Sequence, residues 1–378
     1  DSVLYWNTEY HIDGFRWDLV GLIDTETINE VMAEVHKTHP NIIFYGEGWT
    51  MSTQVTKDGY TMTTQVNSQE TPGFAFFSDT LRDAIRGGNS NNSKPGYVAN
   101  SGGFAGNISD CFTGSPAWCK SPAQSINYAS CHDNHTLFDR ITMSTPEASF
   151  ADRVKMNNLS AAIVLTSQGI PFIHAGEEML RSKPLEDGSF DHNSYRSSDA
   201  VNNLKWADMR GEEYQLTYAY YQGLIAFRKA HPALTMTSAG EVAEKITKLG
   251  GLDFNVVGFH IAAGANGEEN ELIVVFNPNP AASTVNLPEG QWTVYINGEK
   301  AGIEPLGTAS GTATAEPISA MVLVKAASEA APSIGIIGGA DGPTAVLVSG
   351  NWGGLAAMAA AVLCAGIAVI VALKNRKK

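Results

Sequence analysis

Three acidic residues could share acid–base chemistry. Asp18, Glu47 and Asp133 each end a short run of apolar and aromatic residues. Carboxyl groups gathered in one pocket raise one another's pKa, so that one can act as an acid while another stays ionised. Glycoside hydrolysis needs this division of roles between two carboxyl groups. A single acid at a strand end is more often a solvated loop residue or a helix cap, and only the combination of three favours a catalytic site.

The elements that would position these acids are short strands separated by helical patterns. Five apolar segments are predicted to be strands, at residues 12–18, 41–47, 74–78, 125–133 and 170–174. Helical patterns between them include residues 26–38 and 151–167. Strands that alternate with helices predict a parallel β/α architecture. Because the carboxyl ends of the strands of a β/α barrel meet on one face, this order would bring the three acids together.

The pattern changes after residue 233 to short strands rich in β-branched and aromatic residues. The clearest of these strands are at residues 256–261, 271–276 and 291–296. Gly, Pro or Asn bounds each of them, and Asn297-Gly298 is a turn signal. Several such strands in close succession predict an all-β sandwich over residues 234–325.

The end of the chain carries a long uncharged segment. Residues 355–373 contain no charged side chain, and the basic cluster 374–378 follows at once. About twenty apolar residues span the hydrocarbon core of a bilayer as a helix, and a basic cluster beside the span stays in the cytoplasm. The pattern predicts a transmembrane helix over 355–373, a cytoplasmic tail over 374–378 and a Gly/Ala-rich juxtamembrane linker over 326–354. The predicted location is the cell membrane, with a single pass and the catalytic part outside the cell.

Several motifs resemble those of a known enzyme superfamily. Three of them resemble successive signature segments of the α-amylase superfamily of glycoside hydrolases, at residues 10–18, 46–49 and 132–134. A closer similarity, to type I pullulanases, rests also on residues 78–87, 174–178 and 193–195. The resemblance covers about residues 1–325. It implies a retaining glycoside hydrolase that cleaves α-1,6-glucosidic branch linkages in pullulan, starch or glycogen-type α-glucans.

The resemblance also implies roles for individual residues. Asp18 would be the nucleophile that forms a covalent glycosyl-enzyme, Glu47 the general acid/base, and Asp133 the acid that holds sugar hydroxyls in the oxocarbenium-like state. Arg16 would hydrogen-bond the nucleophile and keep it ionised. Trp49 would stack on a sugar ring, although a Trp packed in the core is an equal alternative. The implied substrate-binding residues are Arg16, His132, Trp49 and Asn134.

The sequence also departs from the superfamily pattern. The first signature segment, which carries an Asn and a His, has no counterpart upstream of Tyr10. Eight strands close a β/α barrel, and the segments found here match strands four to eight. We therefore expect an incomplete catalytic barrel, a partial (β/α)8 TIM barrel, over residues 1–233. An open sheet leaves a strand edge unpaired, so we expect the chain alone to be poorly stable and inactive.

Three alternatives stay open. An α-1,4-acting amylase or a branching enzyme of the same superfamily would share the signature segments, because these do not fix the choice of linkage. A noncatalytic glucan-binding surface protein could use a degenerate barrel. A component of a sodium pump is a third alternative, since residues 334–344 resemble a membrane segment of the β subunits of sodium-translocating decarboxylases, where the residue matching Asp341 serves the ion.

Composition and the remaining motifs limit the partners. The chain has 25 Lys and Arg against 39 Asp and Glu, a net charge of −14, which argues against nucleic acid because phosphates need basic partners. No His spacing is typical of a zinc site, and no Asp/Asn run matches a calcium loop. We expect no metal and no cofactor, with calcium possible by resemblance alone.

Cys111 and Cys119 could form a disulfide or remain free thiols, and Cys131 beside His132 is interpreted as a packing residue.

Overall fold

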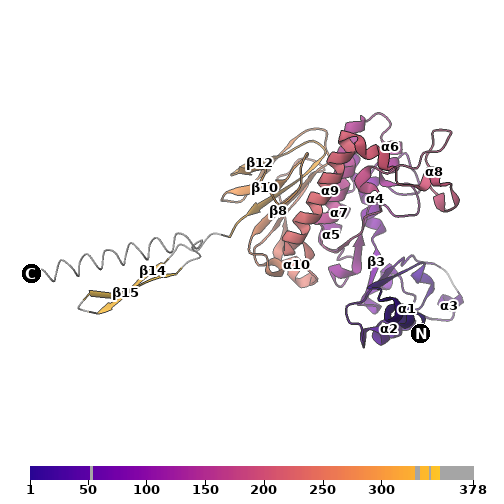
Figure 1. Cartoon of the computed structure of the whole chain (residues 1–378), viewed down its shortest axis with the longest axis horizontal. Coiled ribbons are helices and arrows are strands. Elements are labelled where there is room, and N and C mark those ends of the chain that lie inside the picture. The colour runs from indigo at the N-terminus through magenta and orange to yellow at the C-terminus, as the bar shows by residue number, and fades with distance from the viewer. Residues whose placement is uncertain (52–53, 328–332, 340–341, 350–378) are drawn as a thin grey trace, which may run out of the picture. The chain divides into compact units, whose positions relative to one another are not determined.

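The computed structural model describes residues 1–51, 54–327, 333–339 and 342–349 (Figure 1). The chain divides into two compact units, Asp1–Ala326 and Ala327–Lys378. The first unit contains a parallel sheet with its helices and an antiparallel β-sandwich, and the second contains a hairpin. Each unit is described by itself.

Five parallel strands form the sheet of the first unit, in the order β1-β2-β3-β4-β5. These strands are Gly14–Trp17 (β1), Ile43–Gly46 (β2), Phe74–Phe77 (β3), Ser125–Asn127 (β4) and Ile170–Pro171 (β5). Because neighbours in the sheet are also neighbours in sequence, the sheet has the arrangement of an open half of a β/α barrel. All five strands run in the same direction, so their carboxyl ends share one edge.

Helices lie before, between and after the five strands. They are Ser2–Tyr10 (α1), Thr25–His36 (α2), Gln54–Lys57 (α3), Asp79–Arg86 (α4), Ala105–Phe112 (α5), Leu137–Ser144 (α6), Phe150–Thr166 (α7), Asp199–Asn202 (α8), Glu212–Ala230 (α9) and Ala239–Lys245 (α10). Side-chain caps fix several starts: Asp24 accepts a hydrogen bond from Thr27 N at α2, and Ser78 accepts one from Leu81 N at α4.

The β-sandwich follows α10. A six-stranded sheet has the order β11-β10-β13-β8-β7-β6, and a two-stranded sheet pairs β12 with β9. The strands are Ile246–Lys248 (β6), Val257–Ile261 (β7), Glu271–Asn277 (β8), Ser283–Asn286 (β9), Trp292–Ile296 (β10), Gly307–Ala309 (β11), Thr312–Ala315 (β12) and Ser319–Lys325 (β13). Trp292 is fully buried between the two sheets, and its indole Nε1 donates to the carbonyl oxygen of Pro288 at 3.0 Å.

The sandwich and the helices of the parallel sheet share one hydrophobic core. Helices α5 and α7 pack against β7, β8 and β13 (Figure 1). The rings of Phe112 and Phe259 stack with their centroids 3.9 Å apart, and the hydroxyl of Tyr97 donates to the carbonyl oxygen of Phe276 at 2.9 Å. The β-sandwich therefore packs on the helices of the parallel sheet, and the two parts bury apolar side chains in common.

The structure corrects the membrane part of the predicted fold class. Among the described residues, none of the helices combines the length and the apolar character that a bilayer crossing requires. The helix predicted over 355–373 and the tail 374–378 lie outside the described residues. The fold class is therefore corrected to a half-barrel parallel sheet and a β-sandwich. The predicted location in the cell membrane and the membrane as a partner rested on that helix alone and are corrected with it.

A hairpin lies within the segment predicted to be a Gly/Ala-rich linker. Strands Ser333–Gly339 (β14) and Gly342–Ser349 (β15) pair in antiparallel orientation. β-Branched residues recur along both strands, which favours extended backbone. Asp341, the residue of the sodium-site alternative, lies outside the described residues.

Candidate active site

The ends of β1 and β2 carry the first two predicted acids. Asp18 directly follows β1, Glu47 directly follows β2, and Arg16 lies within β1. The register pairs Arg16 with Tyr45 and Trp17 with Gly46, so the two acids leave the sheet side by side. The parallel pairing of these strands thus brings together residues that are far apart in sequence.

The guanidinium of Arg16 joins both carboxylates. Its Nη1 donates to Asp18 Oδ1 at 2.5 Å, and its Nη2 donates to Glu47 Oε1 at 2.7 Å. The backbone N–H of Leu19 donates to the other oxygen of Glu47 at 3.2 Å. Burial lowers the pKa of Arg16, but its hydrogen bond to Asp18 and the charges of Glu47 and Asp18 outweigh burial and raise it. Arg16 therefore stays protonated, and its guanidinium lies between the carboxylates of Asp18 and Glu47.

The two acids have different environments. The side chain of Glu47 is 8% exposed, whereas that of Asp18 is 71% exposed. Close backbone packing fixes Glu47, because a Cβ added to Gly46 would lie 2.4 Å from the carbonyl oxygen of Trp17. A rigid buried carboxyl beside an accessible one is an arrangement that suits separate chemical roles.

A cleft of about 300 Å³ opens beside Glu47. Its lining residues come from the ends of β2, β3 and β4 and from α4 and the loop after it: Glu47, Trp49, Phe77, Asp79, Arg82, Asn89, Tyr128, Cys131, Asp133 and Asn134. The structure therefore places Glu47, Trp49, Asp133 and Asn134 in one cleft. Trp49 also packs against the apolar side chains of β3 and β4, so it contributes both to the core and to the wall of the cleft.

The remaining predicted residues lie at the border of the cleft. Asp18 and Arg16 are not among its lining residues, and they are joined to it through the ion pair with Glu47. His132 does not line the cleft either. Its Nε2 lies 3.7 Å from Asp133 Oδ1, and both side chains are 61% exposed.

Sequence reasoning assigned no role to several residues of the cleft. Asp79 lies two residues after β3 and directly after the strand predicted over 74–78, so the rule that found Asp18 and Glu47 would also have found it. Arg82 lies one turn further along α4, and its Nη1 donates to the hydroxyl of Tyr128 at 2.8 Å. Burial raises the pKa of Tyr128, which keeps this hydroxyl neutral. Asp79, Arg82 and Tyr128 therefore add polar groups to the lining of the cleft.

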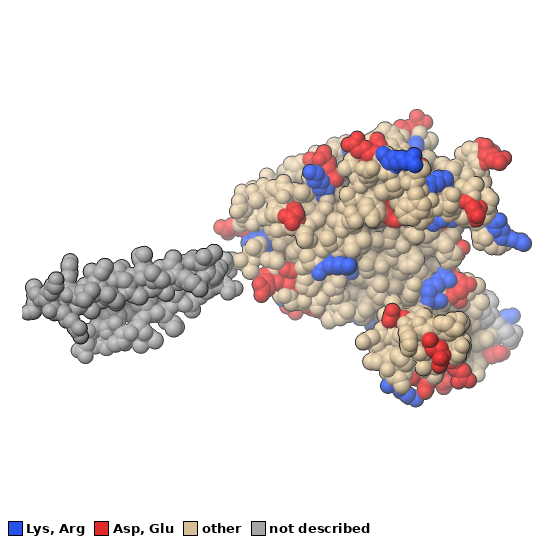
Figure 2. Space-filling model, viewed as in Figure 1, with Lys and Arg blue, Asp and Glu red and all other residues tan. Residues whose placement is uncertain are grey.

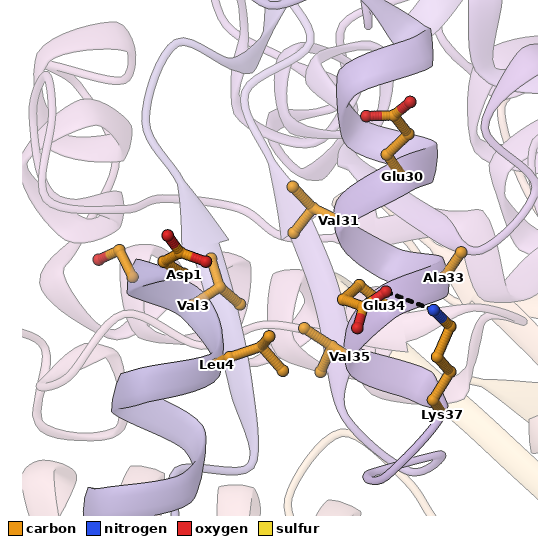
Figure 3. A pocket seen from close by; sticks show the side chains of 10 residues that line it. Asp1, Val3, Leu4, Glu30, Val31, Ala33, Glu34, Val35 and Lys37 are labelled. Carbon is orange, nitrogen blue, oxygen red and sulfur yellow. Dashed lines mark hydrogen bonds and ion pairs between the residues drawn. The ribbon is translucent and has the colours of Figure 1, made fainter.

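Another hollow lies between α1 and α2 (Figure 3). It is lined by Val3, Leu4 and residues of α2, and its only marked ion pair joins Lys37 Nζ to Glu34 Oε2 at 2.5 Å (Figure 3). It contains none of the predicted site residues. Acidic side chains gather on the part of the surface over α1 and α2 (Figure 2), so this region repels anionic ligands.

Cys111 and Cys119 lie outside the lining of the cleft. Cys111 and Cys119 are free thiols and both are buried, so the disulfide alternative is not observed. Burial raises the pKa of Cys111 to about 11. Within the described part of the chain, no group of three or more His, Cys, Asp or Glu side chains is arranged to hold a metal ion.

Comparison with known proteins identifies the relatives of this chain. Residues 245–300 match the family "Pullulanase, all-beta domain". The pullulanase of Bacillus subtilis (strain 168) is 33% identical over 295 residues, which cover 76% of this chain and 40% of that protein. The pullulanase of Klebsiella pneumoniae is 28% identical over 378 residues, covering 77% of this chain and 34% of the relative.

Solved structures agree with these relatives. The pullulanase from Bacillus acidopullulyticus superposes with a TM-score of 0.80 at 34% identity, covering 86% of this chain and 39% of that one. The pullulanase from Paenibacillus barengoltzii in complex with maltohexaose and α-cyclodextrin gives a TM-score of 0.77 at 36% identity. The match covers 85% of this chain and 49% of that one. The chain thus spans less than half the length of these relatives. Over most of its own length, this chain is a homologue of the pullulanases.

Proposed function

We propose that this chain carries the catalytic carboxyl groups of a retaining glycoside hydrolase that cleaves α-1,6-glucosidic linkages in pullulan and branched α-glucans. The observation that carries the proposal is the bridge of Arg16 between Asp18 and Glu47 beside a cleft that also contains Asp133. Retaining enzymes use two carboxyl groups about 5 Å apart, and a shared guanidinium keeps two carboxyl groups close together.

The proposed first step forms a covalent glycosyl-enzyme. Asp18 attacks the anomeric carbon, the glycosidic bond breaks, and Glu47 gives its proton to the leaving oxygen. Arg16 holds Asp18 in place through the hydrogen bond from its Nη1. In the second step Glu47 takes a proton from water, the hydroxyl group attacks the anomeric carbon, and Asp18 leaves as a carboxylate. The net reaction is hydrolysis with retained configuration.

The proposed ligand is an α-glucan. Solved relatives hold maltohexaose with α-cyclodextrin in one case and maltotetraose in others. In this chain, Trp49 offers an aromatic face to a sugar ring, while Asp133 and Asn134 offer polar groups to its hydroxyls. A cleft with one aromatic wall and several polar groups suits a neutral polyhydroxyl ligand.

The test is hydrolysis of pullulan compared with that of linear amylose. Because the chain spans less than half of its relatives' length, two proteins are assayed: the chain alone, and a chimera in which the preceding residues come from the Bacillus subtilis pullulanase. We expect release of reducing ends from pullulan with an α-configured product. Glu47→Gln should reduce the rate at least about a hundredfold, the usual loss when a general acid/base is removed. Cleavage of amylose without cleavage of pullulan would favour the α-1,4-acting alternative. Binding of the glucan without any cleavage would favour the noncatalytic glucan-binding alternative.

A further inference from the structure

Two sequence motifs have no part in the proposed reaction, yet each buries an ionisable side chain. Arg86 belongs to the motif at residues 78–87 and is 2% exposed, and Glu177 belongs to the motif at 174–178 and is 5% exposed. Burying a charged group is costly unless it makes specific contacts. The contacts of these two side chains therefore show what their burial provides.

Both side chains contact the segment that leads from β4 to Asp133. The Nε of Arg86 donates to the carbonyl oxygen of Ala129 at 2.7 Å. The hydroxyl of Ser130 donates to Glu177 Oε1 at 2.5 Å. Adjacent residues of the segment are thus held by a cation from α4 and by a carboxyl group from the loop after β5.

Among the described residues, this segment has no strand partner to hold it. Strand β4 ends at Asn127, and the pairing of β4 with β5 also ends there. The backbone of Asn134 has a φ of 63°, so the chain turns sharply just after Asp133. Side-chain contacts therefore replace the β-ladder in fixing residues 128–133.

Arg86 and Glu177 are themselves firmly anchored. Asn157 of α7 donates from Nδ2 to the carbonyl oxygen of Glu177 at 3.2 Å and contacts the hydroxyl of Tyr221 in α9 at 3.1 Å. On the other side, Arg86 Nη2 donates at 2.9 Å to Oδ1 of Asn89, which lines the cleft. Gly87 has a φ of 90° and allows the chain to leave α4 directly after Arg86.

We propose that Arg86 and Glu177 are positioning residues that hold the segment 129–133 at the edge of the cleft. The functional part of this inference rests on the proposed function, because that function makes Asp133 a ligand of the sugar. The structural part is independent of it. Loss of either contact should release the segment and weaken glucan binding without removing a group that touches the glucan.

Cys131 provides a local probe of this segment. Its thiol lines the cleft and accepts a hydrogen bond from the backbone N–H of Asp133. Its alkylation by iodoacetamide therefore reports how often the segment opens. Cys111 and Cys119 are buried elsewhere and serve as internal references in the same peptide digest.

The main variant is Ser130→Ala, which removes the contact with Glu177 and leaves both charged side chains in place. We expect Cys131 to react about three- to tenfold faster, the range that loss of one hydrogen bond gives for a local opening equilibrium. Glu177→Gln keeps an oxygen acceptor and should react like the unaltered chain. Ser144→Ala is the matched control, since Ser144 is also a buried serine with one hydrogen bond, but lies in α6.

Maltohexaose binding, measured by calorimetry on the same proteins, separates the two hypotheses. Faster alkylation together with an affinity reduced about threefold or more supports the whole proposal. Faster alkylation in a protein whose unaltered form does not bind maltohexaose supports the positioning role and overturns the proposed function for this chain. An unchanged alkylation rate in Ser130→Ala overturns the positioning role, whatever the affinity.

Discussion

The buried carboxyl group of Glu177 should make the stability of the protein depend on pH. Burial raises its pKa from 4.5 to about 8, the charge of Glu178 also raises it, and the hydrogen bond from Ser130 acts in the opposite direction. The folded chain therefore keeps a proton on Glu177 that the unfolded chain loses at lower pH. Stability from this group is fully present below pH 4.5 and is lost as the pH rises toward 8.

The size of the effect follows from the width of this window. Each pH unit between 4.5 and 8 lowers the free energy of unfolding by about 1.4 kcal/mol through Glu177. Glu177→Gln has no proton to lose and keeps the shape and the acceptor oxygen. We expect the variant to match the unaltered chain near pH 4.5 and to gain about 3 kcal/mol relative to it between pH 5 and pH 7.

The assay is urea unfolding followed by circular dichroism at several pH values between 5 and 8. The difference between the two proteins isolates Glu177, because all other groups titrate in both. Glu213→Gln removes an exposed carboxyl group from α9 and serves as the control, with no comparable trend. A difference between Glu177→Gln and the unaltered chain that stays constant with pH would refute the reasoning.

Three further predictions concern packing and charge, and each is measured by urea unfolding at pH 7. Arg16→Met should cost about 3 kcal/mol because it leaves the buried carboxyl of Glu47 without its cation, and an unchanged free energy of unfolding would count against the bridge. Gly46→Ala should lower the free energy of unfolding by about 2 kcal/mol or more, because the new Cβ would meet the backbone of Trp17. Its control is Gly106→Ala in α5, where the new Cβ meets nothing within 4 Å and the free energy of unfolding should not fall. Phe259→Ala should lower the free energy of unfolding by about 4 kcal/mol, because it leaves a cavity in the core beside Phe112. Phe254 is 78% exposed, so Phe254→Ala should lower it by less than about 0.5 kcal/mol. Equal losses in the two Phe variants would contradict the shared core.

Local patterns predicted most of the elements that carry the first two acids. Strand β1 lies within the predicted 12–18 and β2 within 41–47, because a buried parallel strand is a short apolar run that ends on a polar residue. Helix α7 at Phe150–Thr166 is close to the predicted 151–167, since Ser149 caps it through Asp152 N. Such elements depend on contacts between residues that are near in sequence.

Features that depend on contacts between residues far apart in sequence could not be predicted from local sequence patterns. The strand predicted over 125–133 ends at Asn127, because Arg86 and Glu177 hold the following residues in place of a neighbouring strand. Periodicity carries no information on such contacts. The link between Arg16 and Glu47 likewise depends on the register of β1 and β2, which only the three-dimensional structure gives.

The central claim is that Glu47 and Asp133 of the cleft perform retaining hydrolysis together with Asp18, which lies beside the cleft at the end of β1 and acts as the nucleophile. The most direct measurement is to trap the glycosyl-enzyme with a fluorinated maltosyl fluoride, in whichever of the two assayed proteins cleaves pullulan, and to locate the adduct by peptide mass spectrometry. We predict a glycosyl ester on the peptide that contains Asp18, and none in Asp18→Asn. An adduct on another residue, or one that persists in Asp18→Asn, would contradict the account.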